Sequence, residues 1–299
     1  MYRQMLIPLD GSNVSEQVLP YARLLARKLN LPVELLAVVD AVGLAACLSP
    51  DDKRNVESFI ANTLSDSAAF LERISTTFPE ASVKCTVEKG RPGEVVIEKA
   101  AADSGTLIAM ATHGRSGIDR WLLGSVAEKV LRGTRNPLLL VRAANGGQRD
   151  GEVILKSVIV PLDGSPLAEK ALSHAAVLAK RMNLELLLFR AYTLTQIIST
   201  YDDYIPDWNK LEAVSKGEAV RYLDQKAREL KENGLTHVSP VVSEGEAAEQ
   251  IIDLGHRTAN SLVVICSHGR SGVGRWVLGS VAERVARHSI GPVLLIRAV

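Results

Sequence analysis

The hydrophobic positions of this chain alternate between short continuous runs and longer stretches with helical spacing. Runs such as Val33 to Val39 and Leu107 to Ala111 are apolar at nearly every position, which is typical of parallel strands covered on both faces. Between such runs, apolar residues recur every three or four positions, as at Val18, Ala22 and Leu25, and this spacing predicts amphipathic helices. The alternation of strand and helix predicts an α/β fold with parallel sheets.

The whole pattern occurs twice along the chain. The segment Leu6 to Ser12 returns as Ile159 to Ser165, and the segment His113 to Ser125 returns as His268 to Ser280 with ten of thirteen residues identical. A repeat of this length indicates two copies of one domain. Each half is expected to hold five strands and four helices in a doubly wound, Rossmann-like parallel sheet with right-handed crossovers.

Two domains follow from the repeat, residues 1–144 and residues 155–299. The stretch between them contains Asn145-Gly146-Gly147, which is typical of a linker. The last strands of the two halves, Leu138 to Val141 and Val293 to Ile296, are apolar, and an unpaired apolar edge strand promotes aggregation. We therefore expect the halves to pack through these strands as a pseudo-twofold pair.

Composition excludes several classes of protein. The 299 residues are 46% hydrophobic and 23% charged, and 35 Lys and Arg against 34 Asp and Glu leave no basic excess for nucleic acid. The three cysteines, Cys47, Cys85 and Cys266, fall in no zinc-ligand or disulfide spacing, which favours a reducing compartment. Because the N-terminus lacks a signal-peptide pattern and no apolar run has membrane-spanning length, we expect a cytoplasmic protein without membrane contact.

A glycine-rich loop ahead of a helix is the strongest chemical signal in each half. Gly114 permits backbone angles that other residues avoid, and Ser125 with Glu128 is expected to form a capping box, like Ser280 with Glu283. Unpaired N–H groups and the helix dipole favour an anion at such a helix start. The alternative is a surface loop that ends in an ordinary cap, but the repetition of the motif favours a phosphate site.

Each half ends its first strand with the same short motif. Proline cannot continue a strand ladder, so Pro8 and Pro161 are expected at the strand ends, and Asp10 and Asp163, each followed by glycine, are expected in a turn. Doubly wound sheets bind ligands beyond the carboxyl ends of the strands, where the winding reverses. If that reversal lies between the first and fourth strands, Asp10 and the loop 112–125 line one crevice.

These residues resemble the universal stress protein family over nearly the whole chain. The shared features are Pro-x-Asp-Gly-Ser at the end of the first strand and the signature of the ATP-binding branch, which reads Gly-x-x-Gly, nine residues, then Gly-Ser or Gly-Thr. The second and third signature glycines fall on Gly114 and Gly124 in the first half and on Gly269 and Gly279 in the second. The resemblance implies the strand order 3-2-1-4-5 in each half.

The resemblance also implies that ATP binds with a divalent cation, Mg²⁺ or Mn²⁺. Asp10 and Asp163 would then lie near the cation, Val38 near the base, and Ser125 on the phosphates. The residues that we expect at the two ATP sites are Pro8, Asp10, Val38, Ala111, His113, Gly114, Gly124, Ser125 and Val126 in the first half, and Pro161, Asp163, Ala191, Cys266, His268, Gly269, Gly279, Ser280 and Val281 in the second.

The first signature glycine is replaced in both halves, by Ala111 and by Cys266. Because the cysteine side chain is larger than the methyl group of alanine, and because Val38 offers the base more apolar surface than Ala191, we expect the N-terminal site to bind ATP more tightly. The alternative is that an aromatic side chain between residues 201 and 208 folds over the second site and stacks on adenine.

Three functions remain compatible with these patterns. The first is a nucleotide-responsive stress protein that binds ATP and changes its interaction with an unidentified protein partner. The second is a nucleotide-free, homodimeric interaction scaffold, which the lost glycine favours. The third is a slow ATPase; faster catalysis is not expected, because no base, nucleophile and orienting group converge in the sequence. Rival nucleotide-binding folds are not expected, because the sequence holds no P-loop, no GxGxxG after the first strand and no serine nucleophile elbow.

Overall fold

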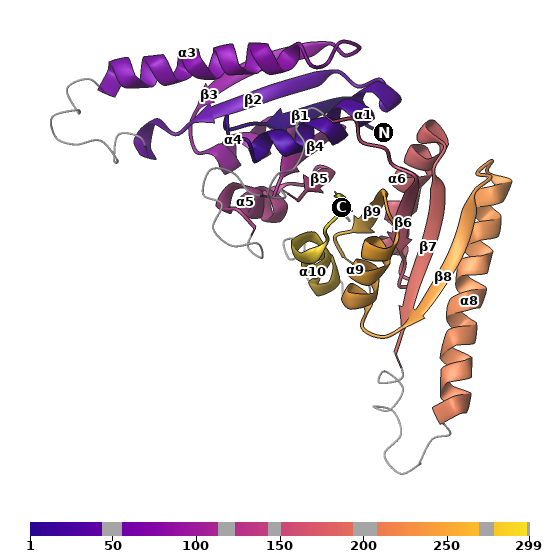
Figure 1. The fold of residues 1–299 in the computed structure, drawn as a ribbon. Coiled ribbons are helices and arrows are strands. Elements are labelled where there is room, and N and C mark those ends of the chain that lie inside the picture. The colour runs from indigo at the N-terminus through magenta and orange to yellow at the C-terminus, as the bar shows by residue number, and fades with distance from the viewer. Residues whose placement is uncertain (44–55, 113–122, 143–150, 194–207, 269–277, 298–299) are drawn as a thin grey trace. The chain divides into compact units, whose positions relative to one another are not determined.

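A computed structural model describes residues 1–43, 56–112, 123–142, 151–193, 208–268 and 278–297 (Figure 1). The chain divides into two compact units, Met1–Val153 and Ile154–Val299. We call them the N-terminal and the C-terminal unit and describe each by itself.

The N-terminal unit holds a sheet with the strand order β3-β2-β1-β4-β5. Its elements in chain order are β1 (Gln4–Pro8), a 3-10 turn η1 (Ser15–Val18), α1 (Leu19–Leu29), β2 (Val33–Val39), α3 (Val56–Ser75), β3 (Val83–Lys89), α4 (Pro92–Ala101), β4 (Thr106–Ala111), α5 (Ser125–Gly133) and β5 (Leu138–Val141).

The C-terminal unit holds a sheet with the order β8-β7-β6-β9-β10. Its elements are β6 (Ser157–Pro161), α6 (Pro166–Met182), β7 (Glu185–Tyr192), α8 (Trp208–Glu232), β8 (Val238–Glu244), α9 (Ala247–Arg257), β9 (Ser261–Cys266), α10 (Ser280–His288) and β10 (Val293–Ile296).

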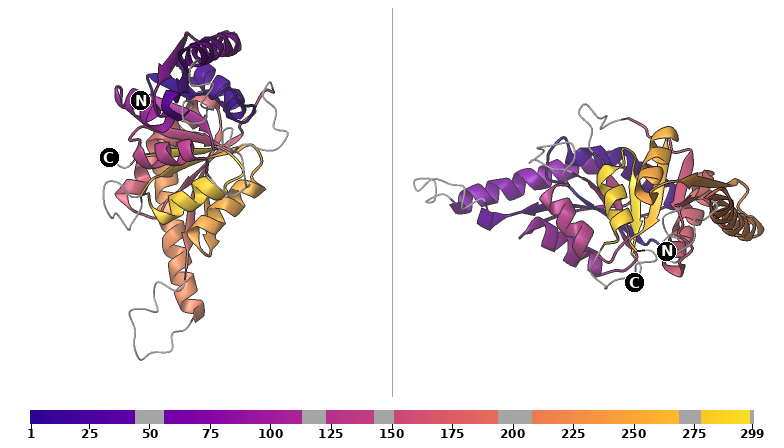
Figure 2. Two further views of the ribbon diagram at one scale, coloured as in Figure 1. Left: turned by 90° about the vertical axis from the view of Figure 1, so that its left-hand side faces the viewer. Right: turned by 90° about the horizontal axis from the view of Figure 1, so that it is seen from below.

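Both sheets have the strand order that the family resemblance implies. Neighbouring strands within each unit run parallel, and helices cover both faces of each sheet, as Figures 1 and 2 show. In the N-terminal unit, α3 packs against β2 and β3, and α4 packs against α5. The predicted doubly wound α/β fold is therefore confirmed for both halves.

The sequence pattern of the central strands explains their position. Both β4 and β9 are buried at every residue, as expected for continuous apolar runs in a covered parallel sheet. The strands β1 and β6 end at Pro8 and Pro161. The amide of the residue after each proline donates a hydrogen bond to the second strand, from Leu9 to the carbonyl of Leu36 and from Leu162 to the carbonyl of Phe189, each at 2.8 Å. The predicted role of the two prolines is confirmed.

The first helix begins differently in the two units. In the C-terminal unit, Ser165 caps α6 by accepting a hydrogen bond from the amide of Ala168 at 3.2 Å, and Pro166 is the first helical residue. In the N-terminal unit, Ser12 accepts from the amide of Ser15 at 3.1 Å, but the turn η1 follows and α1 begins only at Leu19. The proline at the first helical position is the visible difference, because its fixed φ suits a helix start.

The predicted capping boxes are wrong. Gly124 and Gly279 occupy the N-cap positions, and the serines that follow are already the first residues of α5 and α10. Glu128 is therefore one residue too late for a capping box. Its carboxylate accepts instead from Arg132 one turn later, at 2.6 Å.

Within the described ranges, no helix has both the length and the apolar character that crossing a bilayer requires. The pairing of the two halves through their last strands stays a prediction.

Candidate functional site

A tight turn follows the first strand of each unit and fixes an aspartate at the carboxyl end of the sheet. Oδ1 of Asp10 accepts from the amide and the hydroxyl of Ser12, at 2.9 and 2.6 Å. Oδ1 of Asp163 accepts from the same two groups of Ser165, at 2.9 and 2.7 Å. The glycine between each pair has a positive φ, 76° and 88°, which the turn requires.

A helix N-terminus is held against the end of the fourth strand in each unit. The amide of Gly124 donates to the carbonyl of Thr112 at 2.8 Å, and the amide of Gly279 donates to the carbonyl of Ser267 at 2.8 Å. A Cβ atom at position 279 would lie 3.1 Å from that carbonyl oxygen, which is closer than ordinary contact. The last signature glycine therefore has a structural role, because only a residue without a side chain lets the start of the helix approach the end of the strand this closely.

These elements enclose a pocket of about 260 Å³ in the N-terminal unit. The expected residues that line it are Pro8, Asp10, Val38, Ala111, Gly124, Ser125 and Val126. His113 and Gly114, which are also expected there, lie outside the described residues. Apolar side chains that also line it include Leu36 and Met110.

The equivalent pocket of the C-terminal unit has a volume of about 620 Å³. The expected residues that line it are Pro161, Asp163, Ala191, Cys266, His268, Gly279, Ser280 and Val281. Gly269, the remaining expected residue, lies outside the described part of the chain. Residues more than a hundred positions apart in the sequence thus meet in one cavity in each unit.

The position of the first signature glycine forms part of the wall in both pockets. Ala111 ends β4 and Cys266 ends β9, and both are buried. Burial raises the pKa of the Cys266 thiol, against the lowering effect of nearby Lys170. The thiol is therefore protonated at neutral pH, and it acts as an apolar wall rather than as a nucleophile.

One imidazole in the C-terminal pocket is only partly satisfied. Nδ1 of His268 lies 3.0 Å from the hydroxyl of Ser267. Its Nε2 is buried and has no hydrogen-bond partner among the residues that the structure describes. A buried polar atom normally finds a partner, so this nitrogen marks a place where a ligand oxygen would be stabilised.

The residues that the structure describes offer little for a metal ion by themselves. No group of three His, Cys, Asp or Glu side chains with metal-binding geometry occurs in the described ranges. Each pocket contributes the aspartate of the turn, Asp10 or Asp163. Because Mg²⁺ is commonly held by one or two carboxylates together with substrate phosphates, this donor set fits a cation that arrives with a nucleotide.

Several residues that line the pockets were not predicted from the sequence. In the C-terminal unit these include Arg190 on β7, and Ser215 and Glu218 on α8. Arg190 carries a visible signal, because it is a charged residue inside an otherwise apolar strand. The two α8 residues carry none, because their place depends on how α8 packs on the sheet.

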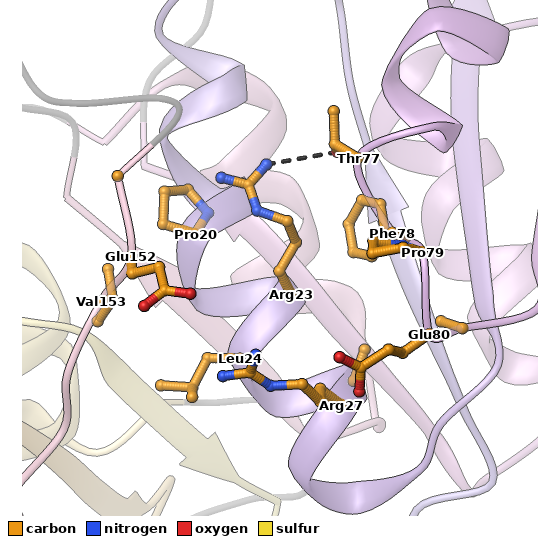
Figure 3. A pocket seen from close by; sticks show the side chains of 13 residues that line it. Pro20, Arg23, Leu24, Arg27, Thr77, Phe78, Pro79, Glu80, Glu152 and Val153 are labelled. Atoms are coloured by element: carbon orange, nitrogen blue, oxygen red, sulfur yellow. Dashed lines mark hydrogen bonds between the residues drawn. The ribbon is translucent and has the colours of Figure 1, made fainter.

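A further cavity of about 200 Å³ lies elsewhere in the N-terminal unit (Figure 3). It is formed by α1, by the connection from Thr77 to Ala81 ahead of β3, and by residues 151–153. Nη1 of Arg23 donates to the hydroxyl of Thr77 across it, at 3.4 Å. None of the predicted site residues that the structure describes lines this cavity.

Known proteins with similar sequences cover both halves of the chain. The model of the universal stress protein family matches residues 1–142 and residues 155–297. Universal stress protein E of Salmonella typhi is 25% identical over 99% of this chain and 95% of its own length. Universal stress protein YxiE of Bacillus subtilis is 30% identical over 48% of this chain and 100% of its own length.

Solved structures show the same tandem fold. A universal stress protein from Archaeoglobus fulgidus superimposes with a TM-score of 0.70 at 21% identity, covering 99% of this chain and 98% of that chain. A functionally unknown protein from Pseudomonas aeruginosa gives a TM-score of 0.64 at 17% identity, covering 99% and 92%. The chain belongs to the universal stress protein family, with one family domain in each half.

Proposed function

We propose that this protein is a nucleotide-responsive regulatory protein that binds ATP together with a divalent cation. The observation that carries the proposal is the equivalence of the two pockets. The same sequence positions, from the proline at the end of the first strand to the residues that open the last helix, line a cavity in both units. Such a cavity, beyond the strand ends and at a helix N-terminus, suits an anionic ligand.

Each end of the N-terminal pocket suits one part of the nucleotide. The first amides of α5 and the hydroxyl of Ser125 would donate to the phosphates, where the helix dipole favours negative charge. The apolar side chains of Leu36, Val38 and Met110 would pack against the base. The cation, Mg²⁺ or Mn²⁺, would neutralise phosphate charge beside Asp10.

The C-terminal pocket offers the same phosphate end and one further donor. Ser280 and the first amides of α10 are equivalent to those of α5. In the tautomer in which Nδ1 of His268 accepts from the hydroxyl of Ser267, Nε2 carries the proton and would donate to a phosphate oxygen.

Pocket size favours the opposite affinity order to the one expected from single residues. Ligand pockets usually measure about 300 to 1,000 Å³, and the C-terminal pocket at about 620 Å³ lies within that range whereas the N-terminal pocket at about 260 Å³ lies below it. We propose that the C-terminal pocket binds the nucleotide more tightly. The C-terminal pocket extends to residues of α8, and the larger side chain of Cys266, at the position equivalent to Ala111, does not remove this extra volume.

A matched pair of pocket-filling variants tests the proposal. Val38 and Ala191 are equivalent, half-buried and pocket-lining, so tryptophan at either position fills one pocket and leaves the core intact. Calorimetric titration with Mg-ATP should show that Val38→Trp and Ala191→Trp each remove one site, and that the double variant binds no ATP. As a control, Leu24→Trp fills the separate cavity of Figure 3 and should leave binding unchanged.

The same titration separates the alternative functions. A folded wild-type protein that binds no ATP would overturn the proposal in favour of the nucleotide-free scaffold. Steady release of phosphate from bound ATP, lost together with binding in the double variant, would instead support the slow ATPase.

A further inference from the structure

The two pockets surround their aspartates with different charges. In the N-terminal pocket, Asp10 is the only charged side chain among the described residues of the lining. The lining of the C-terminal pocket includes Asp163 together with Arg190, Glu218 and Glu246. The two equivalent aspartates therefore differ in whether the lining also supplies an arginine.

The backbone places Arg190 beside Asp163. The amide of Leu162 donates to the carbonyl of Phe189 at 2.8 Å, and Asp163 and Arg190 are the residues that follow this pair. Neighbouring strands lie about 4.8 Å apart in the direction of such a hydrogen bond. The two side chains therefore leave the backbone from adjacent strand ends.

Tyr222 on α8 interacts with both of these charges. The guanidinium carbon of Arg190 lies 4.8 Å from the centre of the Tyr222 ring. Burial raises the pKa of the Tyr222 hydroxyl, Glu169 and Asp163 raise it further, and Arg190 lowers it. Because Asp163 and Arg190 both act on this one hydroxyl, they lie in the same part of the pocket.

Glu169, the carboxylate that accepts from Tyr222, has a cation of its own. Its Oε1 accepts from the Tyr222 hydroxyl at 2.8 Å, and its Oε2 lies 3.0 Å from Nζ of Lys226. The charge of Glu169 is therefore balanced without Arg190.

The other two acidic side chains of the lining are balanced or screened as well. Glu246 accepts from the amides of Ala248 and Glu249 at the start of α9, and it pairs with Arg284 at 2.9 Å. Glu218 is exposed, so that solvent and salt screen its charge. Asp163 is half-buried, and Arg190 therefore compensates this carboxylate more than the others.

The N-terminal unit has no counterpart of Arg190. Ala37 holds the equivalent place, because Leu36 pairs with Pro8 as Phe189 pairs with Pro161. Ala37 is buried and carries no charge. The described lining of the N-terminal pocket contains no basic side chain at all.

This difference changes what a nucleotide needs in each pocket. Phosphates held at the start of the last helix approach the aspartate of the turn, and like charges at short range repel. In the N-terminal pocket a divalent cation that arrives with the nucleotide removes this repulsion. In the C-terminal pocket the guanidinium beside Asp163 already compensates the carboxylate.

We propose that Arg190 takes the place of the divalent cation in the C-terminal pocket, which therefore binds its nucleotide without a metal, whereas the N-terminal pocket requires one. This inference rests on the proposed function, because it takes both pockets to hold a nucleotide with its phosphates at the last helix. It restricts the requirement for Mg²⁺ or Mn²⁺ to the N-terminal pocket.

The two single-pocket variants measure the metal requirement of each pocket. Calorimetric titration with ATP is carried out in excess Mg²⁺ and again in excess EDTA. Ala191→Trp, which keeps the N-terminal pocket, should lose at least about tenfold in affinity in EDTA, because a charge next to Asp10 is removed. Val38→Trp, which keeps the C-terminal pocket, should lose less than about threefold.

Further substitutions in the Val38→Trp background assign this behaviour to Arg190. Arg190→Met should make ATP binding as dependent on Mg²⁺ as it is in Ala191→Trp. Arg190→Lys keeps the charge and should keep metal-free binding, which a role that depended only on the arginine fork would not predict. Arg221→Met is the control, because it removes an exposed arginine of α8 that does not line the pocket.

The outcomes separate this inference from the proposed function. Equal losses in EDTA for the two single-pocket variants would overturn the inference and leave nucleotide binding intact. Metal-free binding that survives Arg190→Met, or Arg190→Gln if the methionine variant does not fold, would overturn the role of Arg190, as would its loss in Arg190→Lys. Failure of both folded single-pocket variants to bind ATP in excess Mg²⁺ would overturn the proposed function and this inference with it.

Discussion

The N-terminal and C-terminal units share their backbone plan and differ in the polar groups placed inside it. Both have the same strand order, the same aspartate turn after the first strand and the same glycine at the start of the last helix. The second strands show the difference, because Glu34 pairs with Leu6 where Leu187 pairs with Ile159. The repeat therefore preserves the positions that shape the backbone and lets the side chains inside each unit diverge.

Glu34 shows how one unit accommodates a charge that the other lacks. The carboxylate is buried, accepts a hydrogen bond from Thr86 at 2.7 Å, and lies 3.3 Å from Nζ of Lys84 and 3.4 Å from Nζ of Lys99. Burial alone would raise the pKa of Glu34, but the hydrogen bond and the two lysines outweigh it and hold the pKa below its usual value. Leu187 needs no such partners, and it fills the equivalent place with apolar surface.

The largest expected effect tests whether the two units are stabilised alike. Leu35 and Leu188 hold equivalent, fully buried positions on β2 and β7. Leu35→Ala and Leu188→Ala should each lower the free energy of unfolding of their own unit by about 2 to 5 kcal/mol, because each leaves a cavity in a packed core. Hydrogen exchange resolved by unit measures this. Equal loss of protection in both units for either variant would show that they unfold as one.

A smaller effect tests whether both last helices approach their strands closely. Gly279→Ala should destabilise the C-terminal unit by about 1 to 3 kcal/mol, because the new Cβ forces α10 away from the carbonyl of Ser267. Gly124→Ala should do the same in the N-terminal unit, where the amide of Gly124 makes the same hydrogen bond. Denaturant unfolding measures both.

The control for these variants is another glycine of the C-terminal unit. A Cβ at Gly255, within α9, would lie 3.8 Å from the nearest atom of Val263, which is ordinary contact. Gly255→Ala should therefore be neutral or stabilising, because alanine favours the helix. Equal destabilisation by Gly255→Ala and Gly279→Ala would contradict the close approach at Ser267.

The smallest expected effect is a difference in acid sensitivity. Because the pKa of Glu34 is lowered by folding, its ionised form stabilises the N-terminal unit at neutral pH, and this contribution is lost as the pH falls below the usual glutamate value of 4.5. Glu34→Leu, which copies Leu187, should remove that part of the acid dependence. Unfolding measured from pH 7 downward checks it, with Glu57→Gln on the exposed side of α3 as control. An unchanged acid dependence in Glu34→Leu would show that Glu34 does not control it.

Much of the fold could be predicted because its signals are local. The strand Val33 to Val39 was predicted with the bounds that the structure shows, since a continuous apolar run between turn residues identifies a buried parallel strand. The start of the last helix was placed one residue wrong, because serine before a glutamate favours a capping box unless the preceding glycine is drawn against a strand end. That contact joins residues distant in sequence.

The sequence by itself determined the repeat, the strand and helix order, the turns after Pro8 and Pro161, and the equivalent positions that line both pockets. These features follow from the spacing of apolar residues and from the backbone limits of glycine and proline, which act over a few residues. Only the tertiary structure decided that the C-terminal pocket is larger and that Arg190 and residues of α8 line it. The packing of a helix on a sheet depends on side chains from several elements at once, and it therefore cannot be predicted from any single stretch of the sequence.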